Sequence, residues 1–212
     1  MVNRLDGGWW KRLHAWMLSK SSARYERAVF RYKQRLLGSL EGDVLEIGPG
    51  GGVNLAHYPE GVRWVGIEPN PFMHAYLQRK AQGLGRRIDL RLGSAESFAW
   101  PGRSFDAVVT TLVICSVSDQ AQVLGEIKRV LRPGGKYVFI EHVAAPEGSR
   151  TRRRQEWIRP LWRVLGDGCH PDRETWLAIE QAGFQHVAVE HFRIPFPIIG
   201  PHIAGFATKA DL

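Results

Sequence analysis

The residues with the clearest chemical potential lie in the run V-L-E-I-G-P-G-G-G, residues 44–52. A short apolar run enters a turn that contains Gly48, Gly50 and Gly52, and a backbone without Cβ atoms can turn sharply there and approach a ligand closely. Glu68 ends the next apolar run, where its carboxylate can accept hydrogen bonds from both hydroxyls of a ribose. The turn and the carboxylate together predict a nucleoside ligand.

The identity of that nucleoside depends on Glu46. A dinucleotide fold places a pyrophosphate at the start of the following helix and favours G-x-G-x-x-G, whereas this turn reads G-P-G-G-G. A carboxylate two residues before Gly48 would repel a pyrophosphate, but it could help to bind the cationic amino group of a methionine moiety, directly or through water. Glu46 therefore favours S-adenosylmethionine, a methyl donor, as the cofactor.

Along the chain, short apolar runs alternate with helix-like segments. These elements must position the glycine turn and the two carboxylates. Strands alternating with helices predict a Rossmann-like α/β fold, a mostly parallel sheet with helices on both faces. The apolar runs 187–192 and 203–208 alternate as an antiparallel pair at one edge of the sheet. The expected parallel strands are 44–47, 62–67, 88–92, 107–111 and 137–141. The expected helices are 53–57, 71–82, 119–130 and 173–182. We expect a single domain over 41–212, with an inserted helix and loop at 146–172 that covers the side of the site where a second substrate binds.

Residues 1–40 precede this pattern and predict amphipathic helices. Tryptophan and leucine alternate with lysine and arginine over 9–20, and Ser21 and Ser22 are expected to break this helix and to cap a second one over about 23–37. A Trp-rich basic helix of this kind can lie at a membrane surface or can cover the site as a lid. Both interpretations remain open.

Composition restricts the partners. The net charge is +8, and much of the positive charge lies in the first 35 residues and around 150–154. Such local clusters can bind an anionic membrane or ligand, or they can simply face solvent. Aromatic and basic residues alternate poorly elsewhere, so we expect no nucleic-acid partner. No apolar run reaches the roughly 18 residues of a membrane span. We therefore expect a cytoplasmic protein, either free or peripheral at the inner membrane surface; the sequence leaves its oligomeric state open.

Two cysteines, Cys115 and Cys169, are far apart and lack the spacing of metal ligands. We therefore expect free thiols, with no disulfide and no metal site.

Five motifs in order resemble those of class I S-adenosylmethionine-dependent methyltransferases: E-I-G-P-G-G-G, I-E-P-N-P, S-A-E-S-F, S-F-D-A-V-V-T-T-L-V-I-C-S-V and L-R-P-G-G-K. The resemblance implies that the three glycines contact the methionine and ribose parts and that Glu68 holds the ribose. It implies that Tyr25 closes over the cofactor. Further cofactor-site residues implied by these motifs are Pro69, Asn70, Ala95 and Glu96 near the nucleoside, and Thr111, Leu112 and Val113 beside the sulfonium.

A narrower resemblance is to the methyltransferase-like family that includes membrane-associated alkyl thiol S-methyltransferases. The segments that carry it are Gly52-Val53-Asn54, 112–117, 141–145, Asp167-Gly168-Cys169 and 193–205. It adds Asn54 to the cofactor site and implies a small, lipophilic thiol as the acceptor. Two features depart from the family pattern: we expect a Trp-rich basic helix over 9–20 where family members have a hydrophobic anchor, and Pro49 and Gly51 replace the commoner Cys and Thr.

Methyl transfer to a thiol needs the acceptor aligned, water excluded and the sulfur deprotonated. The candidate bases are His142, Asp167 and His202, and His142 leads because strand ends face the ligand crevice. Alternatively, His142 serves only to hydrogen-bond a neighbouring loop, and Asp167 serves only to cap the loop before Gly168. Candidates for the acceptor pocket are Trp157, Trp162, Cys169 and Phe196, which could equally pack in the core. Alternative acceptors are a phospholipid headgroup or other small amine, or a quinone-like phenol.

Overall fold

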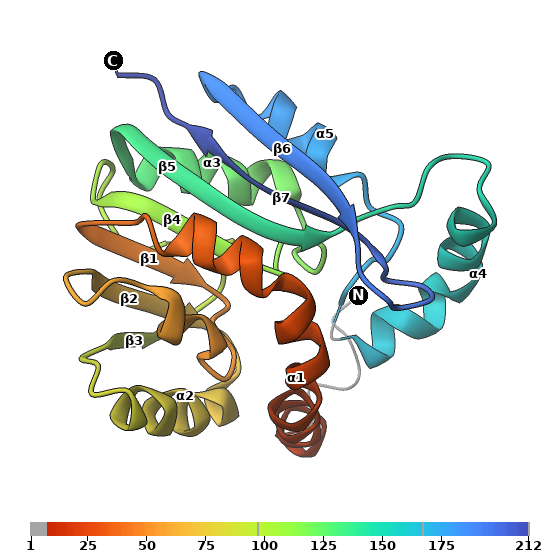
Figure 1. Cartoon of the computed structure of the whole chain (residues 1–212), viewed down its shortest axis with the longest axis horizontal. Helices are drawn as coiled ribbons and strands as arrows, with labels where there is room; N and C mark the ends of the chain where they lie inside the picture. The colour runs from red at the N-terminus through yellow and green to blue at the C-terminus, as the bar shows by residue number, and fades with distance from the viewer. Residues whose placement is uncertain (1–7, 97, 167, 212) are drawn as a thin grey trace.

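A seven-stranded sheet forms the centre of the molecule, with the strand order β3-β2-β1-β4-β5-β7-β6 (Figure 1). The computed structural model describes residues 8–96, 98–166 and 168–211, and the side chains of these residues except Trp10 and 13–22. The strands β1 to β5 are parallel, and β7 runs antiparallel between β5 and β6. Their bounds are β1 Asp43–Ile47, β2 Arg63–Glu68, β3 Asp89–Leu92, β4 Phe105–Thr111, β5 Leu131–His142, β6 His186–Arg193 and β7 Pro201–Thr208.

Helices cover both faces of this sheet, which confirms the predicted α/β fold with an antiparallel edge. On one face α3 (Gln120–Val130) and α5 (Thr175–Gln181) pack over a core of aliphatic and aromatic side chains. On the other face lie α1 (Gly8–Leu37), the short 3₁₀ helix η1 (Val53–His57) and α2 (Pro71–Gly83). Alternate residues of each central strand supply the two cores, because successive side chains of a strand point to opposite faces.

The N-terminal segment is one continuous helix, α1, so the expected break at Ser21 and Ser22 is wrong. Serine in a helix interior costs at most about 0.7 kcal/mol relative to alanine, which is little against the packing of a long apolar face. Val29 and Leu36 of that face are buried. The first half of α1 reaches the start of α2, where the Lys11 carbonyl accepts a hydrogen bond from Asn70 Nδ2 at 3.1 Å.

The insertion after β5 contains α4 (Arg150–Leu165), which lies apart from the sheet (Figure 1). Ser149 caps its first turn by accepting a hydrogen bond from the Arg152 N–H at 3.1 Å. The buried Gln155 ties α4 to the end of β5, because its side chain bonds the Val143 carbonyl and the Ala145 N–H at 3.2 and 2.8 Å. This anchor sets where the loop after α4 returns to the sheet.

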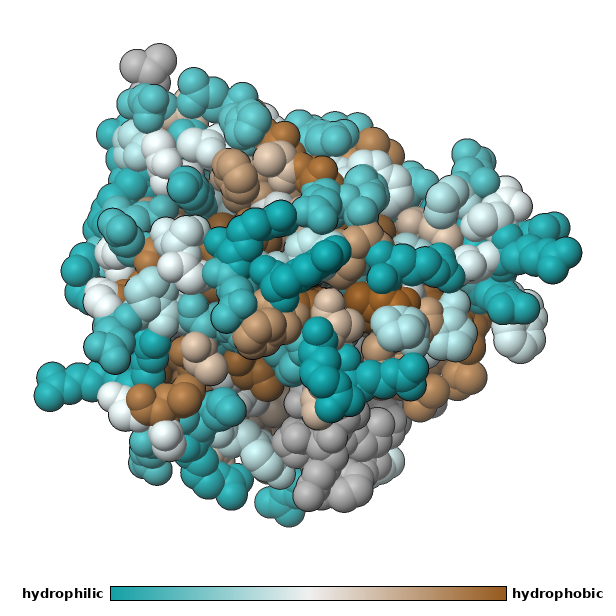
Figure 2. All heavy atoms as spheres, in the orientation of Figure 1, coloured by the Kyte–Doolittle hydropathy of each residue, from teal (hydrophilic) through white to brown (hydrophobic). Residues whose placement is uncertain are grey.

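Hydrophilic side chains, interrupted by apolar patches, cover the face of the molecule that carries α1 (Figure 2). None of the helices described is both long and apolar enough to cross a membrane.

Candidate active site

The carboxyl ends of β1, β2, β4 and β5 meet at one edge of the sheet, because parallel strands run in the same direction. The predicted cofactor residues follow these ends: the glycine turn comes after β1, Glu68 ends β2 and Thr111 ends β4. His142 ends β5 at the same edge. The fold thus places residues from four separate segments around one site.

The glycine turn adopts a conformation that side chains would oppose. Gly48, Gly50 and Gly52 have φ angles of 62°, 53° and 77°, in the left-handed region. A Cβ on Gly48 would also lie 2.8 Å from Val113 Cγ2, so this glycine lets β1 and the loop after β4 approach each other. The turn is closed by a hydrogen bond from the Gly52 N–H to the Pro49 carbonyl at 2.9 Å.

Glu68 joins this turn to the start of α2. Its Oε2 accepts a hydrogen bond from the Gly50 N–H at 3.0 Å, and its Oε1 accepts one from the Asn70 N–H at 2.8 Å. Asn70 in turn caps α2, since its Oδ1 accepts from the Phe72 N–H at 3.1 Å. The side chain of Asn70 therefore positions α1 and α2 around the site, while Pro69 beside it is exposed.

Glu46 is buried beneath the turn and bonds three side chains. Asn54 Nδ2 donates to its Oε1 at 2.8 Å, and the Tyr58 hydroxyl and Trp64 Nε1 donate to its Oε2, each at 2.9 Å. Burial raises the pKa of the Glu46 carboxyl, while these three hydrogen bonds act in the opposite direction. Since Asn54 Nδ2 also lies 3.0 Å from Thr111 Oγ1, Glu46 orients Asn54 against the end of β4.

Buried polar atoms without a partner gather at this edge. Within the part of the chain that the structure describes, these side-chain atoms are Tyr25 Oη, Asn54 Oδ1, Glu141 Oε2, His142 Nδ1 and His202 Nε2. Buried polar groups are nearly always paired, so five orphans together indicate where a polar ligand supplies the partners. Glu141 is a residue that sequence reasoning missed; an acidic residue ending a buried strand beside His142 was the available signal.

Tyr25 and His202 stand together on the α1 side of the site. Their ring centroids are 5.7 Å apart, and the His202 ring lies 6.2 Å from that of His142. Burial raises the pKa of Tyr25 well above its usual value, so this residue stays a neutral hydroxyl. Burial also lowers the pKa of His202 to about 4, so its imidazole is neutral near pH 7.

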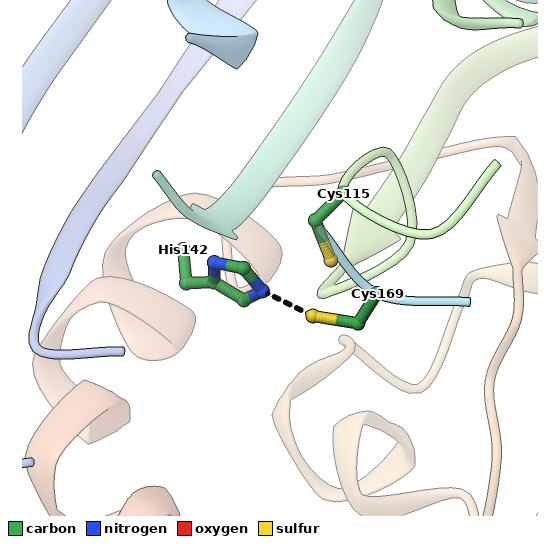
Figure 3. A group of neighbouring side chains, drawn as sticks. All are labelled: Cys115, His142 and Cys169. Atoms are coloured by element: carbon green, nitrogen blue, oxygen red, sulfur yellow. Dashed lines mark hydrogen bonds between the residues drawn. The ribbon is translucent and has the colours of Figure 1, made fainter. Parts of the chain in front are cut away.

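A compact sulfur and imidazole group completes the site (Figure 3). His142 Nε2 lies 2.8 Å from Cys169 Sγ, and one ligand-type atom from each of Cys115, His142 and Cys169 lies within 4.8 Å of the others. Trp162 Nε1 donates a hydrogen bond to Cys169 Sγ at 3.2 Å. A hydrogen bond from Cys115, aided by the one from Trp162, lowers the pKa of Cys169 despite burial. Cys115 is a second residue that sequence reasoning did not place here.

Comparison with known proteins decides the family. Residues 45–139 match the family described as "Methyltransferase domain". The chain is 39% identical to thiol S-methyltransferase TMT1B of Rattus norvegicus over 87% of its own length and 78% of that protein. It is 36% identical to thiol S-methyltransferase TMT1A of Homo sapiens over 90% of its own length and 81% of that protein. The chain belongs to this methyltransferase family. A solved SAM-dependent methyltransferase from Aquifex aeolicus shares the fold, with a TM-score of 0.65, 18% identity, and coverage of 93% and 97%.

The methyltransferase uses S-adenosylmethionine as its cofactor, and the residues present fit that ligand. Asn54 Oδ1 and Glu141 Oε2 are buried acceptors that could receive N–H donors. Glu68 lies where the ribose is expected, and Leu112, with a φ of 59°, turns the chain after β4 in the left-handed region. Of the residues expected at the adenine, Ala95 is buried and Glu96 accepts the Ser118 N–H at 3.2 Å.

The structure brings some of the predicted acceptor-side residues together and separates others. The structure brings Trp162, Cys169 and His142 together, and Phe196 packs beside the core under Arg24. Trp157 is 83% exposed on α4, so the structure does not bring it to this group. Asp167 lies outside the described residues.

Proposed function

We propose that this methyltransferase transfers the methyl group of S-adenosylmethionine to the sulfur of a small, lipophilic thiol and releases S-adenosylhomocysteine. The similarity to the thiol S-methyltransferases carries the proposal. It extends over 87% of the chain, whereas the general methyltransferase domain spans only residues 45–139. The shared sequence must therefore include segments outside that general domain, and such segments supply the acceptor side.

The side chains around His142 support a thiol. The bound cofactor supplies a methyl group already activated by the positive charge of its sulfonium. The chain must then exclude water, orient the acceptor and favour its thiolate, since a free thiol has a pKa of about 8.5. The aromatic rings of Tyr25 and Phe192 flank His202 at centroid distances of 5.7 and 5.4 Å, and this apolar surrounding suits a lipophilic acceptor. We assign His142 to the part of the site that binds the acceptor sulfur.

The acceptor assignment is tested with labelled S-adenosylmethionine and a series of alkyl thiols of increasing chain length. We expect thioether products, with kcat/KM rising as the alkyl chain lengthens. The matched alkyl alcohols and amines are the controls and should remain unmethylated. Methylation of phosphatidylethanolamine vesicles, small amines or a quinone-like phenol, with no product from any thiol, would show that the acceptor is wrong.

The cofactor arrangement gives a second prediction, at Glu68. Glu68→Ala removes the proposed ribose acceptor and also frees the Gly50 and Asn70 amides that it holds. We expect affinity for S-adenosylhomocysteine to weaken by about 1–3 kcal/mol, roughly 5- to 150-fold. Titration calorimetry measures this change. Glu68→Gln keeps one acceptor oxygen and should lose less.

A matched control for Glu68 is Asp89→Ala, an exposed carboxylate at the start of the neighbouring strand β3. This control should bind S-adenosylhomocysteine as the unmodified protein does. If the Glu68→Ala protein is folded by circular dichroism and binds with unchanged affinity, the ribose lies elsewhere.

A further inference from the structure

We propose that Cys115, His142 and Cys169 form a Zn²⁺ site whose fourth ligand position receives the sulfur of the acceptor thiol. The inference rests on the proposed thiol methylation and gives it a means of activating the acceptor. The spacing of the two cysteines in the sequence predicted no metal site, but the fold brings both sulfurs to the end of β5 (Figure 3).

The distances suit a tetrahedral ion. One donor atom from each of the three residues lies within 4.8 Å of the others. A tetrahedral zinc with Zn–S near 2.3 Å and Zn–N near 2.0–2.1 Å separates its ligand atoms by roughly 3.5–3.8 Å. The contact of 2.8 Å between His142 Nε2 and Cys169 Sγ would widen by roughly 0.7 Å when an ion enters.

The backbone around the two cysteines is held from several directions. Arg173 donates hydrogen bonds to the carbonyls of Ile114, Cys115 and Val117 at 3.1, 3.2 and 2.6 Å. The His170 N–H donates to the Cys115 carbonyl at 3.0 Å, which ties the loop after α4 to the loop after β4. These bonds keep two distant cysteines together without an ion, and such preorganisation is what a metal site requires.

The surrounding hydrogen bonds favour a thiolate ligand. The indole N–H of Trp162 can only donate, so Cys169 Sγ is the acceptor in the contact of 3.2 Å between them. Donors of this kind around a ligating sulfur orient it and stabilise its charge. In His142 the proton can reside on Nδ1, which leaves the lone pair of Nε2 directed at the sulfurs.

The donor set selects the metal. Two thiolates and one imidazole suit Zn²⁺, and three protein ligands with one open position are the arrangement of catalytic rather than structural zinc. The acceptor R–SH would bind as R–S⁻ and release its proton to solvent. Its sulfur then forms the bond to the methyl carbon while the bond from that carbon to the sulfonium breaks, and the electron pair stays on S-adenosylhomocysteine. The neutral thioether is a weaker ligand and leaves.

The test measures metal binding directly on the full chain, reduced and stripped with a chelator. We expect one equivalent of zinc by mass spectrometry, and with Co²⁺ the visible bands of a tetrahedral ion together with a thiolate charge-transfer band. Cys115→Ser, Cys169→Ser and His142→Asn should each weaken zinc binding by more than about 100-fold. His186→Asn, which changes an exposed histidine of β6, is the matched control and should bind zinc normally.

Activity separates this inference from the proposed function. We expect the stripped protein to lose thiol methylation while it still binds S-adenosylhomocysteine, and zinc should restore the activity. Full thiol methylation without metal would overturn the inference and leave the proposed function intact. Absence of zinc and cobalt binding in the reduced protein, or zinc binding that survives Cys115→Ser and Cys169→Ser, would also overturn it. Zinc binding with no activity on any thiol would contradict the proposed function and, with it, the role assigned to the fourth position.

Discussion

Replacement of Glu46 by alanine is expected to lower the free energy of unfolding by about 3–5 kcal/mol, because three buried donors lose their shared acceptor. The carboxylate accepts hydrogen bonds from Asn54, Tyr58 and Trp64, and all three donors are buried. Each buried donor left without a partner costs about 1–3 kcal/mol. The alanine side chain is too small to fill the space that the carboxylate leaves. Urea unfolding followed by circular dichroism measures the loss. Affinity for S-adenosylhomocysteine should fall as well, because Asn54 loses the carboxylate that orients it.

Tyr58→Phe is the matched control for this network. It removes a single donor and leaves Glu46 bonded to Asn54 and Trp64, so we expect a loss of about 1 kcal/mol. Equal losses in the two variants would mean that Glu46 does not organise the three side chains.

Gly205→Ala is the second large effect, and it concerns the antiparallel edge of the sheet. Gly205 lies in β7, between β5 and β6, and a Cβ there would be 1.9 Å from the Ala188 carbonyl oxygen and 3.1 Å from Phe139 Cζ. The carbonyl belongs to the paired strand β6 and cannot move without breaking the pairing. We expect the protein to be destabilised by about 3 kcal/mol or more. Its melting temperature should fall by roughly 6–12 °C, as measured by differential scanning calorimetry.

Gly125→Ala provides the comparison for Gly205→Ala. Gly125 is exposed in α3, and an added Cβ meets no atom within 4 Å. Alanine there should raise stability by about 0.5–1 kcal/mol, because glycine loses more conformational freedom in a helix. If both variants are neutral or stabilising, β6 and β7 do not pair as described.

Periodicity predicted the α/β order well because it is a local signal. The central parallel strands β1, β4 and β5 are largely buried and read as apolar runs. The runs 187–192 and 203–208 form the antiparallel pair β6 and β7, in which β6 is the edge strand and β7 is largely buried between β5 and β6. The same local reasoning was wrong at Ser21 and Ser22, since the preference of serine for helix ends is weaker than the packing of α1 on the sheet and α2.

The acceptor side was harder to predict. His142 was identified by its place at a strand end and Cys169 as a candidate for the acceptor pocket, but no sequence pattern placed Cys115 beside them. Their contact depends on where the loop after α4 returns to the sheet. The buried Gln155 and the half-buried Arg173 determine this through hydrogen bonds to distant carbonyls. The tryptophans of α4 were equally hard to place from the sequence, because Trp162 contacts Cys169 while Trp157 of the same helix is exposed.

The sequence by itself determined the alternating strands and helices, the glycine turn and the carboxylate that follows it, because each depends on residues that are neighbours in the chain. Only the tertiary structure decided that Glu46 is bonded by three side chains of the protein, and that two cysteines and a histidine meet at the end of β5. Those contacts join segments far apart in sequence, and their formation depends on how β4, β5 and α4 pack rather than on any local pattern.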